Sequence, residues 1–287
     1  MELLVGTITN VVISSSMYIL VALGLAFVFN MLGILNLAHG AVYMVGGYIC
    51  YEFAAGIGLN SWVALLITTA ILALFGVFIE KYCFRPFVGN FNAAVTICVA
   101  LTVVLQTIVN ILIGTAQVST PTFAQGVFKK GLISVSNERI ATCAVGVVLV
   151  LLVLWFVNKT KWGQQMQAIA QNREAAYLQG INVRRVSALA CAMGCGLAAV
   201  AGSLMGAFLN LNPFMGDFML VKALVLVILG GLGSIGGVVI AGLVLGGVGA
   251  ILPVLIDPLT AEAITIGVIV VLLLFRPQGF FGREVET

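Results

Sequence analysis

The stretch TITNVVISSSMYILVALGLAFVF, residues 7–29, decides the fold, because it carries no charged side chain over its whole length. An α-helix of about 20 apolar residues spans the roughly 30 Å hydrocarbon layer of a membrane. Only Glu2 is charged ahead of this stretch, and no Lys or Arg occurs before Lys81, so the basic start of a cleavable signal peptide is missing. We therefore expect residues 7–29 to stay in the chain as a membrane-spanning helix.

The rest of the chain has the same character. Of its 287 residues, 62% are hydrophobic and 8% are charged, and the mean hydropathy is +1.20. Soluble domains are about 45–50% apolar and about 25% charged, so this chain cannot cover a soluble surface. A soluble enzyme, a nucleic-acid-binding protein and a disordered regulator are excluded. The composition predicts an all-α polytopic membrane protein, with residues 1–287 forming a single transmembrane domain in contact with membrane lipid.

Hydrophobic runs predict about eight or nine transmembrane helices, some of them broken or re-entrant. Beyond the first, single spans are predicted at residues 41–55, 62–79, 93–113, 141–157, 186–209 and 263–275. The Gly-rich run 218–256 is too long for one crossing and barely long enough for two, so we expect two short helices joined by a turn near residues 230–237. Asp217 and Lys222 are expected near the outer end of the first of these helices, where they can reach the membrane surface or pair.

Positive charge gathers on one side of the predicted membrane. The loop 158–185 carries five basic residues and the single acid Glu174. The basic residues that follow residue 79 and those of the C-terminal tail fall on the same side, whereas Lys129 and Lys130 fall on the other. Because Lys and Arg concentrate in cytoplasmic loops, the loop 158–185 and the C-terminus are expected in the cytoplasm. The N-terminus and the loop 115–138 are then expected in the periplasm.

The cytoplasmic loop is predicted to contain an amphipathic helix from Gly163 to Gln179, ended by Gly180. Its apolar stripe is formed by Met166, Ile169, Ala170, Ala176 and Tyr177. Such a helix can lie on the membrane surface, pack beneath its own bundle, or insert into a groove on a soluble partner. The pattern alone leaves all three interpretations open.

One motif in this loop resembles a known family. Glu174-Ala175-Ala176, followed after three residues by Gly180, resembles the EAA motif of permease subunits of bacterial ABC importers. Three further stretches resemble one branch of that family, the branched-chain amino-acid permeases: GILNLAHGAVYMVGGY (33–48), VLVILGGLGSIGG (225–237) and FRPQGFFG (275–282). The four segments follow one another in matching order along nearly the whole chain.

The resemblance implies the permease subunit of an ATP-driven importer in the bacterial inner membrane, which translocates branched-chain amino acids delivered by a periplasmic binding protein. It also implies a second permease subunit, homologous or identical, and two ATP-binding subunits that hydrolyse ATP. The chain itself is therefore not expected to be an enzyme or to hold a cofactor, and no nucleic acid is expected as a partner. Importers of the same class that carry urea, short amides or other amino acids are the alternative.

The same resemblance assigns coupling to the ATP-binding subunit to Arg173, Glu174, Ala175, Ala176 and Gly180. Small side chains at the two alanines would let a helix seat closely in a partner's groove. Gly180 would let the chain turn, and Glu174 would accept hydrogen bonds or pair with Arg on the partner. A bulky residue at these positions is expected to hold the helix away from its partner.

The segment Asn36-Leu37-Ala38-His39-Gly40 lies between the first two spans with no polar loop around it. If the chain turns within the membrane, its backbone must face protein or a water-filled cavity, and such broken helices often line transport sites. Asn36, His39 and Gly40 are therefore candidates for the translocation pathway. Alternatively, Asn36 and His39 cap helix ends and lock the bundle. His39 is the sole histidine, and no second cluster of metal-ligand residues supports a metal site or catalysis.

A second break is predicted at the Gly-rich run whose candidate pathway residues are Gly230, Gly231, Gly233 and Ser234. It lacks the lysine of a phosphate-binding loop, so close helix packing and a hinge are favoured over nucleotide binding. A broken segment near each end of the chain suggests an inverted repeat. Thr102, Gln106 and Asn110 share one helix face and are expected to form interhelical hydrogen bonds or to line the pathway.

Two other transporter classes are compatible with the composition. A secondary transporter would place paired acidic residues in mid-membrane, whereas Asp217, Asp257 and Glu262 are expected near span ends. A channel would not need the loop around Glu174. Both are therefore disfavoured against the importer permease.

Overall fold

The computed structural model describes residues 2–114, 116–130, 133–257, 260–261, 263–265, 267 and 279. Its α-helices are α1 (Glu2–Leu32), α2 (His39–Tyr51), α3 (Ser61–Ile79), α4 (Phe91–Leu112), α5 (Asn137–Lys159), α6 (Lys161–Gln171), α7 (Arg173–Leu178), α8 (Val183–Met205), α9 (Met215–Gly230) and α10 (Ile235–Leu255). Single π or 3-10 turns are η1 (Glu52–Gly56), η2 (Glu80–Phe84) and η3 (Arg85–Phe87), and β1 (Val127–Lys130) pairs with β2 (Ile133–Ser136) in an antiparallel hairpin. The predicted span 263–275 and the terminal stretch 275–282 lie almost entirely outside the described residues.

The prediction of an all-α polytopic membrane protein is confirmed. Six described helices are long and apolar enough to cross a membrane: α1, α3 with its two following turns, α4, α5, α8 and α10. The helix α2 has 13 residues and continues through the five residues of η1, and α9 has 16 residues, so they rise about 27 and 24 Å, which is less than a hydrocarbon layer. Both must therefore begin or end inside the bundle.

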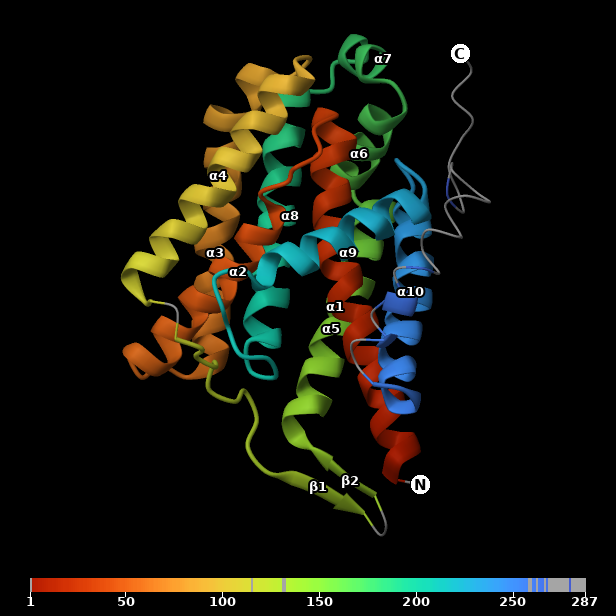
Figure 1. Ribbon diagram of the computed structural model, residues 1–287. Helices are drawn as coiled ribbons and strands as arrows, with labels where there is room; N and C mark the ends of the chain where they lie inside the picture. The colour runs from red at the N-terminus through yellow and green to blue at the C-terminus, as the bar shows by residue number, and fades with distance from the viewer. Residues whose placement is uncertain are drawn as a thin grey trace.

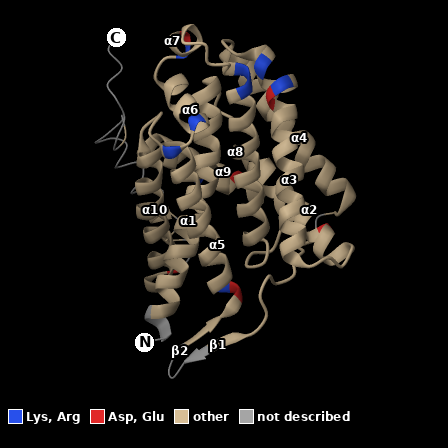
Figure 2. Ribbon diagram, turned by 180° about the vertical axis from the view of Figure 1, so that it is seen from behind, with Lys and Arg blue, Asp and Glu red and all other residues tan. Residues whose placement is uncertain are grey.

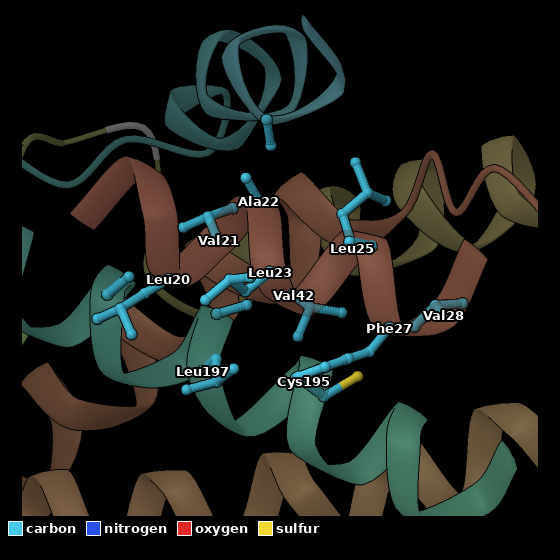
Figure 3. Packing of buried hydrophobic residues seen from close by; sticks show 14 of the residues in the cluster. Leu20, Val21, Ala22, Leu23, Leu25, Phe27, Val28, Val42, Cys195 and Leu197 are labelled. Atoms are coloured by element: carbon cyan, nitrogen blue, oxygen red, sulfur yellow. The ribbon is translucent and has the colours of Figure 1, made fainter. Parts of the chain in front are cut away.

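The helices form one bundle around α1 and α8 (Figure 1). We call the end that carries α6 and α7 the α7 end, and the end that carries the β-hairpin and the N-terminus the hairpin end. The helix α1 packs on α8 and α10, and α8 packs on α2 and α3. In the centre, Leu23 and Phe27 of α1 point toward Leu197 and Cys195 of α8 (Figure 3). These four side chains are buried, which makes the α1–α8 contact the middle of the hydrophobic core.

The chain re-enters the bundle twice to start α2 and α9 near mid-height (Figure 1). Before α2, the Thr102 hydroxyl donates to the carbonyl oxygen of Leu37 at 3.3 Å. Thr102 lies at the midpoint of α4, so Leu37 reaches half the height of that helix. The start of α9 touches the start of α2 through Gly40 and Gly216, where an added Cβ on either glycine would collide with the carbonyl oxygen of the other. Only glycine at both positions permits this crossing of backbones.

The second re-entrant segment differs from the sequence-based expectation. The predicted turn near residues 230–237 is confirmed, since α9 ends at Gly230 and α10 begins at Ile235. However, the chain enters the bundle earlier, through residues 206–214, which were assigned partly to a complete span and partly to an outer loop. Asp217 lies in the first turn of α9, but α9 begins at mid-height of the bundle, so the expectation that this end of the helix reaches the membrane surface is wrong.

Replacing Gly40 by Ala is expected to lower the free energy of unfolding by about 3 kcal/mol, because the new methyl group meets backbone that no rotamer change can move aside. Gly249→Ala is the matched control, since its Cβ would lie 3.9 Å from the Tyr18 ring, an ordinary contact. Thermal unfolding in detergent measures both variants. Equal unfolding temperatures for the two would contradict the backbone crossing.

Candidate functional site

Each half-length helix starts from the same asparagine turn. The Asn36 side-chain oxygen accepts a hydrogen bond from the Ala38 backbone N–H at 3.1 Å, and the Asn212 oxygen accepts one from Phe214 N–H at 3.0 Å. In both turns the carbonyl oxygen of the asparagine accepts a second bond, 3.1 Å long, from the N–H three residues on. The crossing glycine follows one residue later in each case. These bonds satisfy polar groups that could find no water in a membrane.

The two turns belong to halves of the bundle that run in opposite directions. The helix α1 runs toward the α7 end and α8 runs away from it (Figure 1), and they touch through Gly24 and Gly194. An added Cβ on Gly24 would lie 2.7 Å from the Gly194 carbonyl oxygen, and one on Gly194 would lie 2.6 Å from the Gly24 oxygen. The helix α3 packs on α8 while α10 packs on α1. This reciprocity supports the hypothesis of an inverted repeat that relates α1–α3 to α8–α10.

His39 is fully buried between these halves. Its Nε2 lies 3.0 Å from the carbonyl oxygen of Val21, so this nitrogen carries the proton and donates. The ring also closes against Gly24, where an added Cβ would lie 3.0 Å from it. Asn36 is 1% exposed. The contacts of both residues support the interpretation that they lock helix ends, and a role in the pathway stays a prediction. Among the described residues no group of three His, Cys, Asp or Glu could hold a metal ion.

The candidate pathway residues fall into two separate places. One group forms the α9–α10 turn at the α7 end and consists of Gly230, Gly231, Gly233 and Ser234. This turn lies about 21 Å along α9 from Gly216. Gly231 and Gly233 have φ of +95° and +94°, and the Ser234 hydroxyl caps α10 by accepting from Gly237 N–H at 3.1 Å. These four residues therefore turn the chain away from the helix crossing, and the structure does not bring them to His39.

The polar face of α4, in contrast, reaches the helix crossing. Thr102 contacts the segment before α2, and the Gln106 side-chain amide donates to Asp217 Oδ1 at 2.9 Å at the start of α9. Interhelical bonding is thus confirmed for Gln106, whereas Thr102 bonds to the segment between α1 and α2 and Asn110 is exposed on the same face. Sequence analysis missed Asp217 because it placed the start of α9 at the membrane surface.

The predicted helix in the loop 158–185 is broken in two. The helix α6 ends before Asn172, which has an extended backbone, and α7 starts after it. The single helix expected from Gly163 to Gln179 is therefore wrong at this position. The Asn172 side-chain oxygen accepts from Ala175 N–H at 2.9 Å, and such a short polar side chain favours the start of a new helix over continuation of the old one. Gly180, with φ +81°, ends α7 as predicted.

The helix α7 presents a partly apolar surface to solvent. Ala176 is 2% exposed and faces its own bundle, whereas Glu174 and Ala175 face outward. Tyr177 and Leu178 are 71% and 85% exposed, so Tyr177 of the predicted apolar stripe does not face the bundle as Ala176 does. Exposed large apolar side chains side by side often mark a contact with another protein. We call the four outward residues, Glu174, Ala175, Tyr177 and Leu178, the α7 surface.

Arg173 points away from the α7 surface, toward α1. Its Nη1 lies 3.5 Å from the carbonyl oxygen of Met31, in the last turn of α1. A cation near the C-terminal carbonyls of a helix is favourable, since these groups carry partial negative charge. Beside this contact lies a cavity of about 500 Å³, lined by residues of α1, α6 and the α9–α10 turn. The α7 surface is thus linked to the end of α1, which leads directly into the segment before α2.

Positive charge marks the same end of the bundle. Figure 2 shows Lys and Arg gathered around α6, α7 and the neighbouring end of α3. The described basic residues here are Lys81, Arg85, Lys159, Lys161, Arg173, Arg184 and Arg185. Arg85 forms a bidentate ion pair with the buried Glu80. The hairpin end carries Lys129, Lys130 and Arg139.

A multi-pass helical bundle with two half-length helices that cross at mid-height has the construction of a membrane transport protein. The sequence model of the branched-chain amino acid transport system permease component matches residues 7–274. The chain belongs to this family, and its relatives are transport permeases rather than enzymes. It is 31% identical to the high-affinity branched-chain amino acid transport system permease protein LivH of Salmonella typhimurium, over 96% of this chain and 95% of that protein.

Two further relatives are also described as permeases of branched-chain amino acid transport. Identity is 32% to the permease protein BraD of Pseudomonas aeruginosa, a high-affinity branched-chain amino acid transport system component, over 94% of each chain. It is 27% to the probable branched-chain amino acid transport permease protein LivH of Methanocaldococcus jannaschii, over 82% of this chain and 76% of that protein. The resemblance inferred from four short motifs is confirmed.

Cysteine labelling tests the orientation of α7. Leu178→Cys is expected to react rapidly with a maleimide in the purified permease, because this position is exposed, whereas Met166→Cys, 2% exposed on α6, should react slowly. Mass spectrometry of the labelled peptide separates these sites from the natural cysteines. Equal labelling of the two positions would contradict the assignment of the α7 surface.

Proposed function

We propose that this chain is the permease subunit of an ATP-driven importer that carries branched-chain amino acids across the bacterial inner membrane. A periplasmic binding protein delivers the cargo, and two ATP-binding subunits supply the energy to this permease and a second one. The α7 surface is the observation that carries the proposal. It combines the Glu174-Ala175 pair of the EAA motif with two exposed apolar side chains, in a chain that has no phosphate-binding loop of its own.

The α7 surface is suited to transmit force. An ATP-binding subunit that holds this surface would move α7 together with α6, and Arg173 would carry the displacement to the last turn of α1. The cavity beside Met31 leaves room for such a shift. Because α1 continues directly into the segment before α2, the displacement would reach the crossing of α2 and α9. ATP and ADP would then favour different packings of the bundle through their different effects on the ATP-binding subunits.

Charge supports the proposed orientation. The basic residues around α7 favour a cytoplasmic position for this end of the bundle, and a periplasmic position for the hairpin end with the N-terminus (Figure 2). The loop 115–138, which contains the β-hairpin, would then face the binding protein. Lys129 and Lys130 go against the charge rule, but they are outnumbered by the basic residues of the α7 end.

The relatives' names support the cargo. The family model and the relatives that cover nearly the whole chain are described by branched-chain amino acid transport. A branched-chain amino acid carries an ammonium, a carboxylate and an apolar side chain. A pathway for it therefore needs polar groups inside an apolar bundle, and the helix crossing offers both.

Ala175→Trp is expected to reduce ATP-dependent leucine uptake at least tenfold while the permease stays folded, because the indole would hold the ATP-binding subunit away from α7. The measurement is uptake into proteoliposomes that contain the complete transporter and the binding protein. Gln164→Trp, exposed on α6 and outside the α7 surface, is the control and should transport normally. Normal uptake by well-folded Ala175→Trp would refute the coupling role.

Gly180 offers a test of the backbone geometry of the loop. Its φ of +81° is accessible to Gly and Asn but strained for a β-branched residue. We expect Gly180→Val to lose most leucine uptake in the same assay and Gly180→Asn to retain it. No atom lies within 4 Å of an added Cβ here, so crowding does not enter the comparison. Equal uptake by the two variants would show that the turn after α7 is unimportant.

A further inference from the structure

Asp217 is a carboxylate placed at the depth where a membrane is most apolar. Its partner Gln106 lies one helical turn, about 6 Å, from the midpoint of α4. Half of a hydrocarbon layer is about 15 Å thick, so the Asp217–Gln106 pair lies well within it. An ionisable side chain at such depth faces a polar partner or a water-filled space rather than lipid.

The protein leaves Asp217 accessible. The side chain is exposed, and within the described residues no Lys or Arg forms an ion pair with it. The nearest basic residue along α9 is Lys222, which points in another direction, five residues or about 140° around the helix. There its ammonium group lies against Tyr18 of α1. The charge of Asp217 is therefore directed to the outer side of α9 and is stabilised there by the Gln106 amide.

A second polar side chain packs beside the helices that carry Asp217 and Gln106. Tyr48 of α2 is 2% exposed, and its hydroxyl forms no hydrogen bond within the described part of the chain. Tyr48 packs in a small cluster with Val109 and Met215. Val109 lies one helical turn from Gln106 on α4, and Met215 begins α9, so Tyr48 packs beside both helices that form the Asp217–Gln106 contact. Buried hydroxyl groups normally have a partner, and a ligand can supply one.

Two exposed apolar residues lie close to Asp217 along the chain. Val221 lies one turn after Asp217 on the same face of α9 and is 55% exposed, and Phe214, just before the helix, is 59% exposed. A carboxylate flanked by exposed apolar groups matches a cation that carries an apolar side chain. It does not match a sugar, which has no charge to compensate.

We propose that Asp217, positioned by Gln106, binds the ammonium group of an amino-acid cargo during its passage, with Phe214 and Val221 against the cargo's side chain. The inference rests on the proposed function. It assigns the exposed face of α4 and the start of α9 to the wall of the pathway. The second permease subunit then closes this wall from the opposite side, because a charged face cannot be left in contact with lipid.

The test uses the complete transporter in proteoliposomes with leucine-loaded binding protein, and it measures leucine transported per ATP hydrolysed. Asp217→Asn keeps the shape and the hydrogen bond to Gln106 but removes the charge, and it is expected to lower this ratio at least tenfold. Asp217→Glu should restore much of it. Glu52→Gln, which removes an exposed carboxylate at the hairpin end, is the control and should leave the ratio unchanged.

Three results would overturn the inference. An unchanged ratio in Asp217→Asn would exclude a role for the charge. Loss of the second permease from the Asp217→Asn complex, seen by size-exclusion chromatography, would show that Asp217 pairs with that subunit instead of the cargo. Equal defects in Asp217→Glu and Asp217→Asn would exclude binding by charge. Failure of the unaltered transporter to accumulate leucine with ATP would instead contradict the proposed function. The three results above concern only the role of Asp217, so the two kinds of failure can be told apart.

Discussion

The structure depends on the requirement that a broken helix inside a membrane must find partners for its free backbone groups within the protein. The chain meets this requirement twice with one device, an asparagine whose side chain and carbonyl group both accept backbone N–H bonds. The glycine pair Gly40 and Gly216 then lets the two helix starts touch through their backbones. Without these contacts α2 and α9 could not begin at mid-height, and neither the Asp217–Gln106 pair nor the buried position of His39 would exist.

This arrangement connects distant parts of the chain. The last turn of α1 contacts Arg173 of the loop 158–185, and the segment that follows α1 leads to the helix crossing. A movement of α7 can therefore reach the centre of the bundle through the Arg173–Met31 contact and the chain segment that follows α1. The hypothesis of an inverted repeat would add a reason for two alternative packings, because related halves can exchange roles between an outward-facing and an inward-facing state.

Much of the fold could be predicted because membrane spans are marked by length and apolarity, as in residues 7–29. The motif around Glu174 and the turn at Gly180 were also accessible, since the residue types themselves carry the signal. The entry of residues 206–214 into the bundle could not be predicted. In the sequence, Asn212 resembles an ordinary loop residue before Pro213. The segments 36–40 and 212–216 share only their first residue, Asn, and their last, Gly. Asp217 was misplaced as a consequence.

Which side chains of α7 are buried and which are exposed could not be predicted from the sequence either. A helix of six residues is too short for a periodic pattern, so burial of Ala176 and exposure of Tyr177 depend on how Asn172 ends α6. Asn172 caps a helix start as Asn36 was expected to do. In both places a local side-chain bond, rather than hydropathy, decides where a helix begins.

The most direct measurement is an electron cryomicroscopy map of the permease purified together with its ATP-binding subunits. The account predicts that each ATP-binding subunit holds a groove around α7, in contact with Glu174, Ala175 and Leu178, at the basic end of the bundle. A map in which α7 is bare, or in which the ATP-binding subunits sit at the hairpin end, would contradict it.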